Sequence, residues 1–371
     1  MGLLDTLLHG GIEHKVKRLD GLIETAGYDE AEGCLLDLRV AIARKHPPGS
    51  ELSVRLDLAE VRLRSKYQQF DRVESPARRA YMAANGFNDK ELLRQAAEEM
   101  ITCAVRGGRL SETVEITEQW IAIGSSDFRQ RVHILIIKGS ALNQLGRFND
   151  ALRAYEAAIR LVESMPVTPD RHERFVTASS GMGDAFLGLD DRAQAINCWR
   201  QAMGATTAQL GPEHPQIASI LICIGTVQLN ADEIEPACGN FTQALEILQA
   251  AGHSESMGAA VAQQKLTLAY LMKGDVRRAS VTAKLAVQAS RAHGPDMRTE
   301  AQELLRKVED AQATPPTAPS SQLQILKTAE ELAEEMPSMD RTMFPARAST
   351  ARPLHRPNRA IPNAKWAAMG R

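Results

Sequence analysis

Hydrophobic and small residues recur at helical spacing on both sides of a short polar stretch at residues 145–150. Positions three, four or seven residues apart share one face of an α-helix. Such positions hold Leu135, Gly139 and Leu142 before the stretch, and Ala151, Tyr155, Ala158 and Val162 after it. Gly146 stands where helices commonly end in a left-handed residue. The pattern predicts two helices packed together, with Gly139 and Ala158 small enough to let them approach closely.

The same pattern returns further along the chain. Aligned on Gly139, it places Gly183, Gly225 and Thr267 in the equivalent position, and the last two steps are each 42 residues long. Each segment continues into a second helical pattern, and Gly274 lies in the turn between the last two. Repetition at a fixed period is typical of a solenoid built from stacked helix pairs.

Before residue 130 the rhythm continues with fewer glycines. Three further units contain Leu19, Val61 and Ile101 at their first helix. We therefore expect a lead-in at residues 1–10, divergent repeats at 11–129 and well-matched repeats at 130–312. The predicted fold is all-α, with about seven helix pairs in one solenoid.

The best-matched unit resembles a tetratricopeptide (TPR) repeat. The residues that carry the resemblance are Gly139, Leu142, Gly146, Phe148, Ala151, Tyr155 and Ala158, while Leu135 stands where Trp is commonest. The 42-residue period and the linker Leu210-Gly211-Pro212-Glu213-His214-Pro215 are similar to the kinesin-light-chain type over residues 130–311. The resemblance implies a right-handed superhelix whose first helices line a concave groove.

Composition agrees with thin helical layers in place of one thick core. Of 371 residues, 44% are hydrophobic but only 4% are aromatic, and the net charge of −2 gives no overall field for nucleic acid. The five cysteines form no Cys-x-x-Cys pair, which favours free thiols in a reducing compartment. No apolar run is long enough to cross a bilayer. We expect a cytoplasmic protein.

Catalytic arrangements are missing from the sequence. It contains no glycine-rich phosphate loop after a strand pattern and no His-x-x-x-His spacing. His214 and His253 lie in linkers, where capping a helix end is the simpler explanation. We expect neither a metal nor a cofactor, and no enzymatic activity.

Projection of the repeat onto helical faces selects a set of residues that point into the expected groove. They are Arg55, Arg62, Lys66, Gln95, Glu99, Thr102, Arg106 and Asn143. Basic and acidic side chains lie beside each other in this set, which suits an extended peptide or helix of mixed charge. Members of the family that bind chaperone C-termini need Lys and Asn at set positions, where this chain has Ile136 and Ser140. Chaperone binding is therefore not expected.

After Asp310 the composition changes. Residues 313–321 form a Pro-rich linker, residues 322–336 an expected amphipathic helix, and residues 337–371 a basic Pro/Arg-rich tail. Residues 341–371 carry +7 and no acid, so the remainder of the chain carries −9. Expected contact residues in this tail are Phe344, Arg347, Arg352, Arg356, Arg359 and Trp366. The tail has three interpretations: a solubilising segment, a docking site for an acidic partner such as tubulin or RNA, or a lid over the chain's own groove.

The sequence thus predicts a non-catalytic scaffold or adaptor. It would hold a partner peptide in the groove and use the tail as a second contact, with no small-molecule substrate and no membrane span. The alternative is a regulatory repeat protein that senses a peptide and changes its superhelical pitch.

Overall fold

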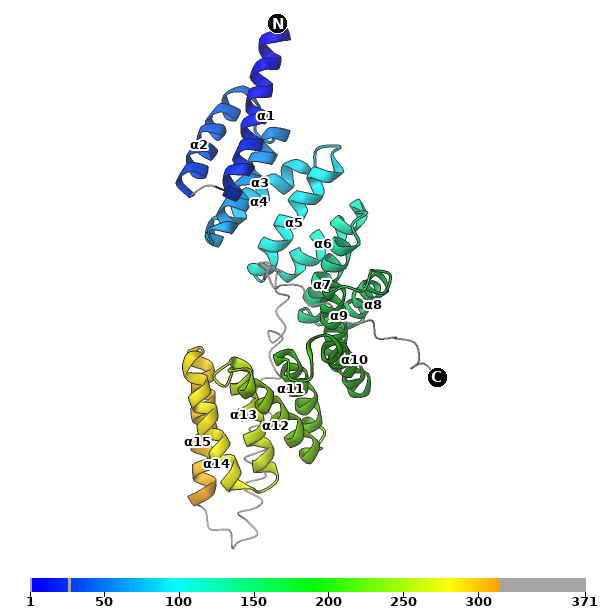
Figure 1. Ribbon diagram of the computed structural model, residues 1–371, viewed down its shortest axis with the longest axis vertical. Coiled ribbons are helices and arrows are strands. Elements are labelled where there is room, and N and C mark those ends of the chain that lie inside the picture. Colours follow the sequence, from blue (N-terminus) through cyan, green and yellow to red (C-terminus); the bar gives the residue numbers. More distant parts are fainter. Residues whose placement is uncertain (1, 26–27, 314–371) are drawn as a thin grey trace, which may run out of the picture.

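Fifteen α-helices and two short 3₁₀ helices follow one another in the computed structural model, which describes residues 2–25 and 28–313 (Figure 1). No strand occurs in these residues. The first seven helices are α1 (Gly2–Thr25), α2 (Tyr28–Lys45), α3 (Glu51–Lys66), α4 (Glu74–Ala84), α5 (Lys90–Arg106), α6 (Leu110–Ile123) and α7 (Phe128–Gln144). The next eight are α8 (Phe148–Glu163), α9 (Pro169–Gly188), α10 (Arg192–Leu210), α11 (Pro215–Asn230), α12 (Ile234–Ala250), α13 (Met257–Met272), α14 (Val276–Ala289) and α15 (Pro295–Ala313). The 3₁₀ helices are η1 (Phe70–Arg72) and η2 (Ser290–Ala292).

Helices α1 to α14 form the seven predicted antiparallel pairs. Second helices α10, α12 and α14 begin at Arg192, Ile234 and Val276, which confirms the 42-residue step. The expected lead-in forms the start of α1. Helix α15 is a single helix that packs on α14 and follows the seventh pair. The expected helix at 322–336 and the tail lie outside the described residues.

The pairs stack into a curved array with an inner and an outer layer (Figure 1). Successive odd-numbered helices touch at several places: α1 with α3, α3 with α5, α7 with α9, α11 with α13 and α13 with α15. Successive even-numbered helices do not pack on each other to this extent. In a curved stack the inner layer is the more crowded one, so the odd-numbered helices form the inner layer, as the repeat pattern predicts.

Small residues and aromatic rings bring the two helices of each pair together. A Cβ atom on Gly139 would lie 2.7 Å from the Tyr155 ring, and one on Gly183 would lie 2.4 Å from the indole nitrogen of Trp199. The same contact joins Gly225 to Phe241 at 2.9 Å. Only a residue without a side chain fits at these crossings. Each ring lies 16 residues after its glycine, so the contact recurs with the repeat.

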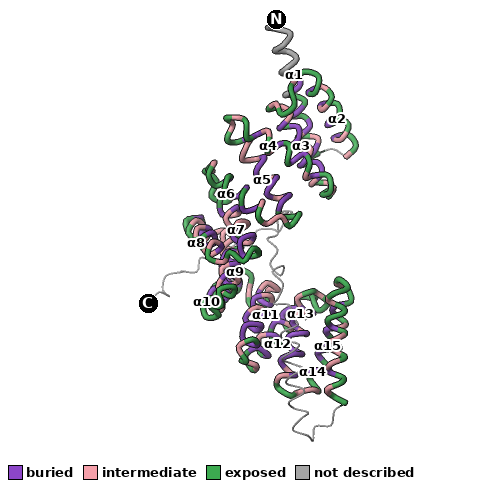
Figure 2. Tube along the Cα trace, turned by 180° about the vertical axis from the view of Figure 1, so that it is seen from behind, coloured by how far each residue is buried: buried purple, intermediate pink, exposed green. Residues whose placement is uncertain are grey.

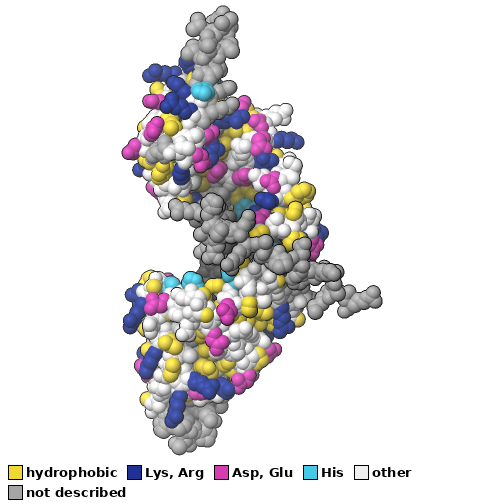
Figure 3. All heavy atoms as spheres, in the orientation of Figure 1, with side chains coloured by type: hydrophobic (Ala, Val, Ile, Leu, Met, Phe, Trp, Pro, Cys, Tyr) yellow, Lys and Arg dark blue, Asp and Glu magenta, His cyan; other side chains and the backbone are white. Residues whose placement is uncertain are grey.

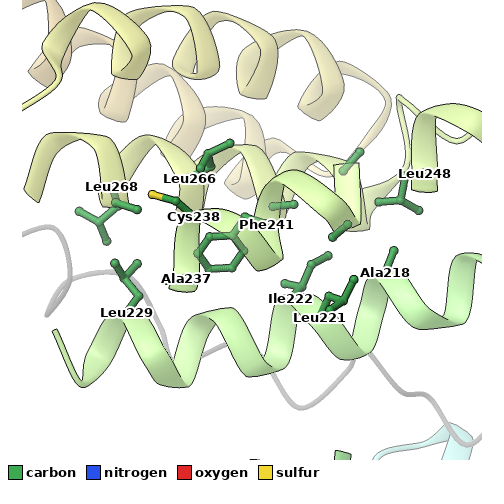
Figure 4. Packing of buried hydrophobic residues seen from close by; sticks show 14 of the residues in the cluster. Ala218, Leu221, Ile222, Leu229, Ala237, Cys238, Phe241, Leu248, Leu266 and Leu268 are labelled. Carbon is green, nitrogen blue, oxygen red and sulfur yellow. The ribbon is translucent and has the colours of Figure 1, made fainter. Parts of the chain in front are cut away.

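The core consists of a series of small clusters, each shared by neighbouring helices. One cluster is built around Phe241 and spans α11 to α15 (Figure 4). Trp199 fills the cluster of α9 to α11, and Tyr155 the cluster of α6 to α9. Helices α11 and α13 are buried along most of their length (Figure 2), as expected for apolar helices in an inner layer.

Ion pairs connect α2, α3 and α4 near the N-terminal end of the array. Asp57 of α3 is 5% exposed and accepts from Arg39 of α2 at 3.0 Å and from Arg79 of α4 at 2.7 Å. Arg64, also on α3, pairs with Glu32 at 2.8 Å. These contacts join α2, α3 and α4.

The turns explain where the helices end. Gly146 has the expected left-handed backbone, with φ of +74°, and Gly274 follows at +78°. The two intervening repeats hold Asp190 and Asp232 in the same position, with φ of +60° and +62°. His214 accepts from the backbone N–H of Gln216 and caps α11, as predicted. The side chain of His253 has no such role.

Candidate functional site

The inner face of α3 carries three of the predicted groove residues. Arg62 pairs with Asp20 of α1 at 2.6 Å, and Lys66 donates to the carbonyl of Glu24 at 2.9 Å. Arg55 pairs with Glu51 at 2.8 Å on its own helix. All three side chains remain exposed, so their contacts within the chain leave them accessible to a ligand.

The inner face of α5 carries four more. Gln95 donates to Glu91 at 2.8 Å, and the Thr102 hydroxyl donates to the carbonyl of Glu98 at 3.0 Å. The guanidinium of Arg106 lies 4.0 Å from the centre of the Phe70 ring.

Glu99 is the acidic member of the set on α5. Burial raises its pKa, while the neighbouring guanidinium of Arg62 on α3 has a smaller, opposite effect. The charge of Arg62 on α3 thus acts on Glu99 on α5, the next inner helix. That both residues line a groove stays a prediction. Charges of both signs alternate over the N-terminal helices (Figure 3).

Asn143 occupies a different environment from the rest of the set. It is 8% exposed, and its side-chain amide donates to the carbonyl of Gly181 on α9 at 2.9 Å. The side chain therefore lies in the seam between α7 and α9. Its Oδ1 atom is buried and has no hydrogen-bond partner in the described part of the chain.

Sequence reasoning missed the acidic residue in the middle of the inner layer. Asp184 lies on α9, one turn after Ser180, so both point to the same side of the helix. Burial raises the pKa of Asp184 to about 7, against a smaller lowering effect of the Trp199 N–H. That N–H itself donates to the carbonyl of Ser180 at 3.2 Å.

Asp184 also affects groups on two other helices. Its charge adds to the burial that raises the pKa of the Tyr155 phenol on α8 and of the Cys223 thiol on α11. Asp184 follows the signature residue Gly183 directly, and that adjacency is the one signal in the sequence that could have identified it. Tyr155 lies 29 residues before Asp184 in the sequence and Cys223 lies 39 residues after it, so only the folded structure shows that they are neighbours.

Several buried side-chain atoms on the odd-numbered helices of the C-terminal half have no hydrogen-bond partner in the described residues; we call them unused polar groups. Ser180 is 1% exposed and Gln264 is 3% exposed, and neither Ser180 Oγ nor Gln264 Nε2 has a hydrogen-bond partner in the described residues. Ser180 on α9 and Gln264 on α13 stand three residues before Gly183 and Thr267, so they occupy the same repeat position two periods apart.

No group of three or more His, Cys, Asp or Glu side chains that would suit a metal ion occurs in residues 2–25 and 28–313. Within the same residues, no helix is long and apolar enough to cross a membrane. The five cysteines are unpaired, and burial raises the pKa of the Cys103 thiol to about 11. That value leaves Cys103 a poor nucleophile at neutral pH. The proposed tail contacts from Phe344 to Trp366 lie outside the described residues.

No family model and no curated protein matches the chain. The apo form of RapI is 12% identical in sequence, and the match covers 87% of this chain and 86% of RapI with a TM-score of 0.61. A Rap protein complexed with competence and sporulation factor is 12% identical over 88% of this chain and 87% of its own, with a TM-score of 0.51. The TPR-like repeats of a kinesin light chain from Podosopora anserina are 16% identical over 58% of this chain and all of their own, with a TM-score of 0.43.

At these identities the likeness is one of fold. The paired helices, the two-layer array and the glycine–aromatic crossings agree with it. The chain is thus a TPR-like α-solenoid.

Proposed function

We propose that this protein is a non-catalytic adaptor that holds an extended segment of a partner protein along the inner face of its helix array. The observation that carries the proposal is the set of unused polar groups on the inner helices. Burying a polar atom without a partner costs roughly 1–3 kcal/mol. Ser180 and Gln264 accept this cost at one repeat position, and the N–H and C=O groups of an extended peptide would supply the missing partners.

The charges of α3 and α5 support the same proposal. Exposed Arg62 and half-buried Glu99 lie beside each other on successive inner helices. Such a pair would fix the register of a peptide of mixed charge. The basic tail would add a second, salt-dependent contact, because exposed charges are screened within about 10 Å at 0.1 M salt.

A selection from displayed random twelve-residue peptides on the full-length protein tests the proposal. Selected peptides should bind wild type and lose at least tenfold in affinity with Arg62→Glu or Glu99→Lys. Arg153→Glu is the matched control, because Arg153 is 76% exposed on the outer helix α8. Peptides that bind all four proteins equally would place recognition elsewhere and refute the adaptor proposal.

A regulatory role is the second candidate, favoured by the likeness to a Rap protein solved with competence and sporulation factor. Here the bound ligand would change the curvature of the array. The match covers 88% of this chain, so the likeness extends beyond the well-matched repeats at 130–312. Small-angle X-ray scattering with and without a selected peptide separates the two roles, since only a regulator should change its radius of gyration.

A further inference from the structure

We infer that Asp184 is the centre of a subsite for a basic side chain, the ammonium of Lys or the guanidinium of Arg, on the bound segment. The inference rests on the proposed function and names the chemistry that the middle of the inner face selects. It is carried by the position of the carboxylate, by its uncharged surroundings and by two unused polar groups beside it.

Asp184 is the acidic residue at a position that is otherwise neutral in the well-matched repeats. The residue after the signature small residue is Ser140 in α7, Asp184 in α9, Thr226 in α11 and Leu268 in α13. In the second repeat the same position holds Arg62. A ligand lying along the inner layer therefore meets an acidic side chain at α9 and a basic one at α3.

The surroundings of Asp184 contain no counter-charge from the described part of the chain. Its neighbours are Tyr155, Trp199 and Cys223, from α8, α10 and α11. No Lys, Arg or His of the described residues forms an ion pair with it, whereas all three acids on α3, Glu51, Asp57 and Glu60, have such a partner. A half-buried carboxylate without a cation is costly. A cationic ligand would remove that cost.

Two further groups beside Asp184 have free hydrogen-bonding capacity. Ser180 Oγ lies one turn earlier on the same face of α9 and has no partner. The side-chain amide N–H of Asn143 donates to the carbonyl of Gly181, and the Oδ1 atom of Asn143 remains an acceptor without a donor. Since a carboxylate and an amide oxygen only accept, the site requires a donor-rich ligand. Ammonium and guanidinium groups carry three and five N–H donors.

Two aromatic rings close the core next to this site. Tyr155 packs directly on the backbone of Gly181, and Trp199 on that of Gly183. Both rings are buried in core clusters, so the selection for a cation comes from the carboxylate and the two polar groups beside it. A metal ion is the weaker reading, because no cluster of three or more metal-ligating acids, His or Cys is present within residues 2–25 and 28–313.

The test uses full-length wild type and Asp184→Asn, which keeps the shape of the side chain and removes its charge. Peptides selected on wild type should share Arg or Lys at one position. A synthetic peptide with citrulline in place of that Arg should bind wild type at least tenfold more weakly, and Asp184→Asn should bind both peptides equally. Equal folding of the two proteins is checked by circular dichroism.

The pH dependence gives a readout that a folding defect would not imitate. Affinity of wild type for the Arg peptide should rise between pH 6 and pH 8, as Asp184 ionises, and the citrulline peptide should show no rise. The phenol of Tyr155 and the thiol of Cys223 have raised pKa values and stay neutral over this range. His133 on α7, whose pKa is lowered by burial and by Arg174, is present in both proteins.

The outcomes separate this inference from the adaptor proposal. Peptides that depend on Arg62 and Glu99 but show no basic preference, or keep it in Asp184→Asn, would overturn the subsite alone. If no selected peptide depends on the inner face, both fall. A full-length variant with Arg347, Arg352, Arg356 and Arg359 changed to Gln identifies the source of the cation. A gain in Arg-peptide affinity in this variant that requires Asp184 would show that the chain's own tail competes for the subsite.

Discussion

The contact between a glycine and an aromatic ring is the residue-scale feature that repeats through the well-matched half. Gly139, Gly183 and Gly225 each lie under a ring sixteen residues later. These contacts were predictable because both partners belong to one helix pair. The surroundings of Asp184 were not predictable, because they join α8, α9, α10 and α11.

Substitution of Gly183 by Ala should destabilise the protein. The new Cβ would lie 2.4 Å from the indole nitrogen of a buried Trp199, so α9 and α10 would have to separate. Overpacking of this kind costs about 1–3 kcal/mol. Gly204→Ala in α10 is the matched control: its Cβ meets nothing within 4 Å, and Ala favours the helix by about 1 kcal/mol. Urea denaturation should move the two midpoints in opposite directions.

Asp232 holds a left-handed turn at the position where other repeats have Gly146 and Gly274. Because a side chain disfavours positive φ, Asp232→Gly should raise the free energy of unfolding by about 0.5–1 kcal/mol. The reciprocal change, Gly274→Asp, should lower it by a similar amount. Thermal melting of both variants checks the pair. A loss of stability in Asp232→Gly would show that the Asp side chain makes a contribution larger than the strain.

Asp184 should make stability depend on pH in a direction unusual for a carboxyl. Its pKa in the folded protein is about 7, above the value near 4 of an unfolded chain. The folded state therefore prefers the protonated form. The stability that this preference gives is complete below pH 4, is lost as pH rises to 7, and stays constant above.

Asp184→Asn should remove this loss and stabilise the protein at pH 7.5 by at most about 4 kcal/mol. Denaturation of wild type and variant at pH 4.5, 6 and 7.5 measures the difference. A difference that stays constant with pH would contradict the raised pKa.

At the scale of elements, the sequence predicted the helices and their arrangement in pairs. It did not predict which contacts hold the helices together in the N-terminal half. Val61 and Ile101 stand where the later repeats have glycine. In the second repeat the ion pair of Asp57 with Arg79 joins α3 to α4. In the third repeat the buried Trp120 of α6 packs on Ile101 and donates to Glu98 of α5. Charged residues on a helical pattern are ordinarily solvent-exposed, so the burial of Asp57 had no signature in the sequence.

Asp57→Ala should destabilise the first three repeats. It removes the more buried of the two acids that Arg39 and Arg79 share and leaves them with Glu60. Losing hydrogen bonds to a charged group costs about 1.5–3 kcal/mol. Asp71→Ala is the control, because Asp71 is 82% exposed and lies 4.0 Å from its partner, Arg72. Chemical denaturation should show a large shift for the first variant and almost none for the second.

At the scale of the whole molecule, the array is a row of small cores with no central one. The inner-layer contact is weaker between α5 and α7 and between α9 and α11 than elsewhere. Stability in such arrays is close to a sum over neighbouring repeats. Damage to one core should therefore stay local.

Phe241→Ala should confine its effect to the C-terminal repeats. The ring is fully buried in the cluster of α11 to α15, and its removal costs about 3–5 kcal/mol. Hydrogen–deuterium exchange should rise in α11–α15 and remain unchanged in α1–α5. Leu142→Ala is the reciprocal variant and should raise exchange in α7–α9. A uniform increase along the chain in either variant would mean that the array unfolds as one cooperative unit.

The order in which the helices contact one another also bears on how the protein is made. All principal contacts join helices that are at most two positions apart in the chain. A growing polypeptide therefore exposes each helix soon after the surface that receives it has formed. Chains whose contacts are close in sequence fold quickly. Synthesis on the ribosome would add one helix pair after another from the N-terminus, so each pair would be stacked before the next is translated.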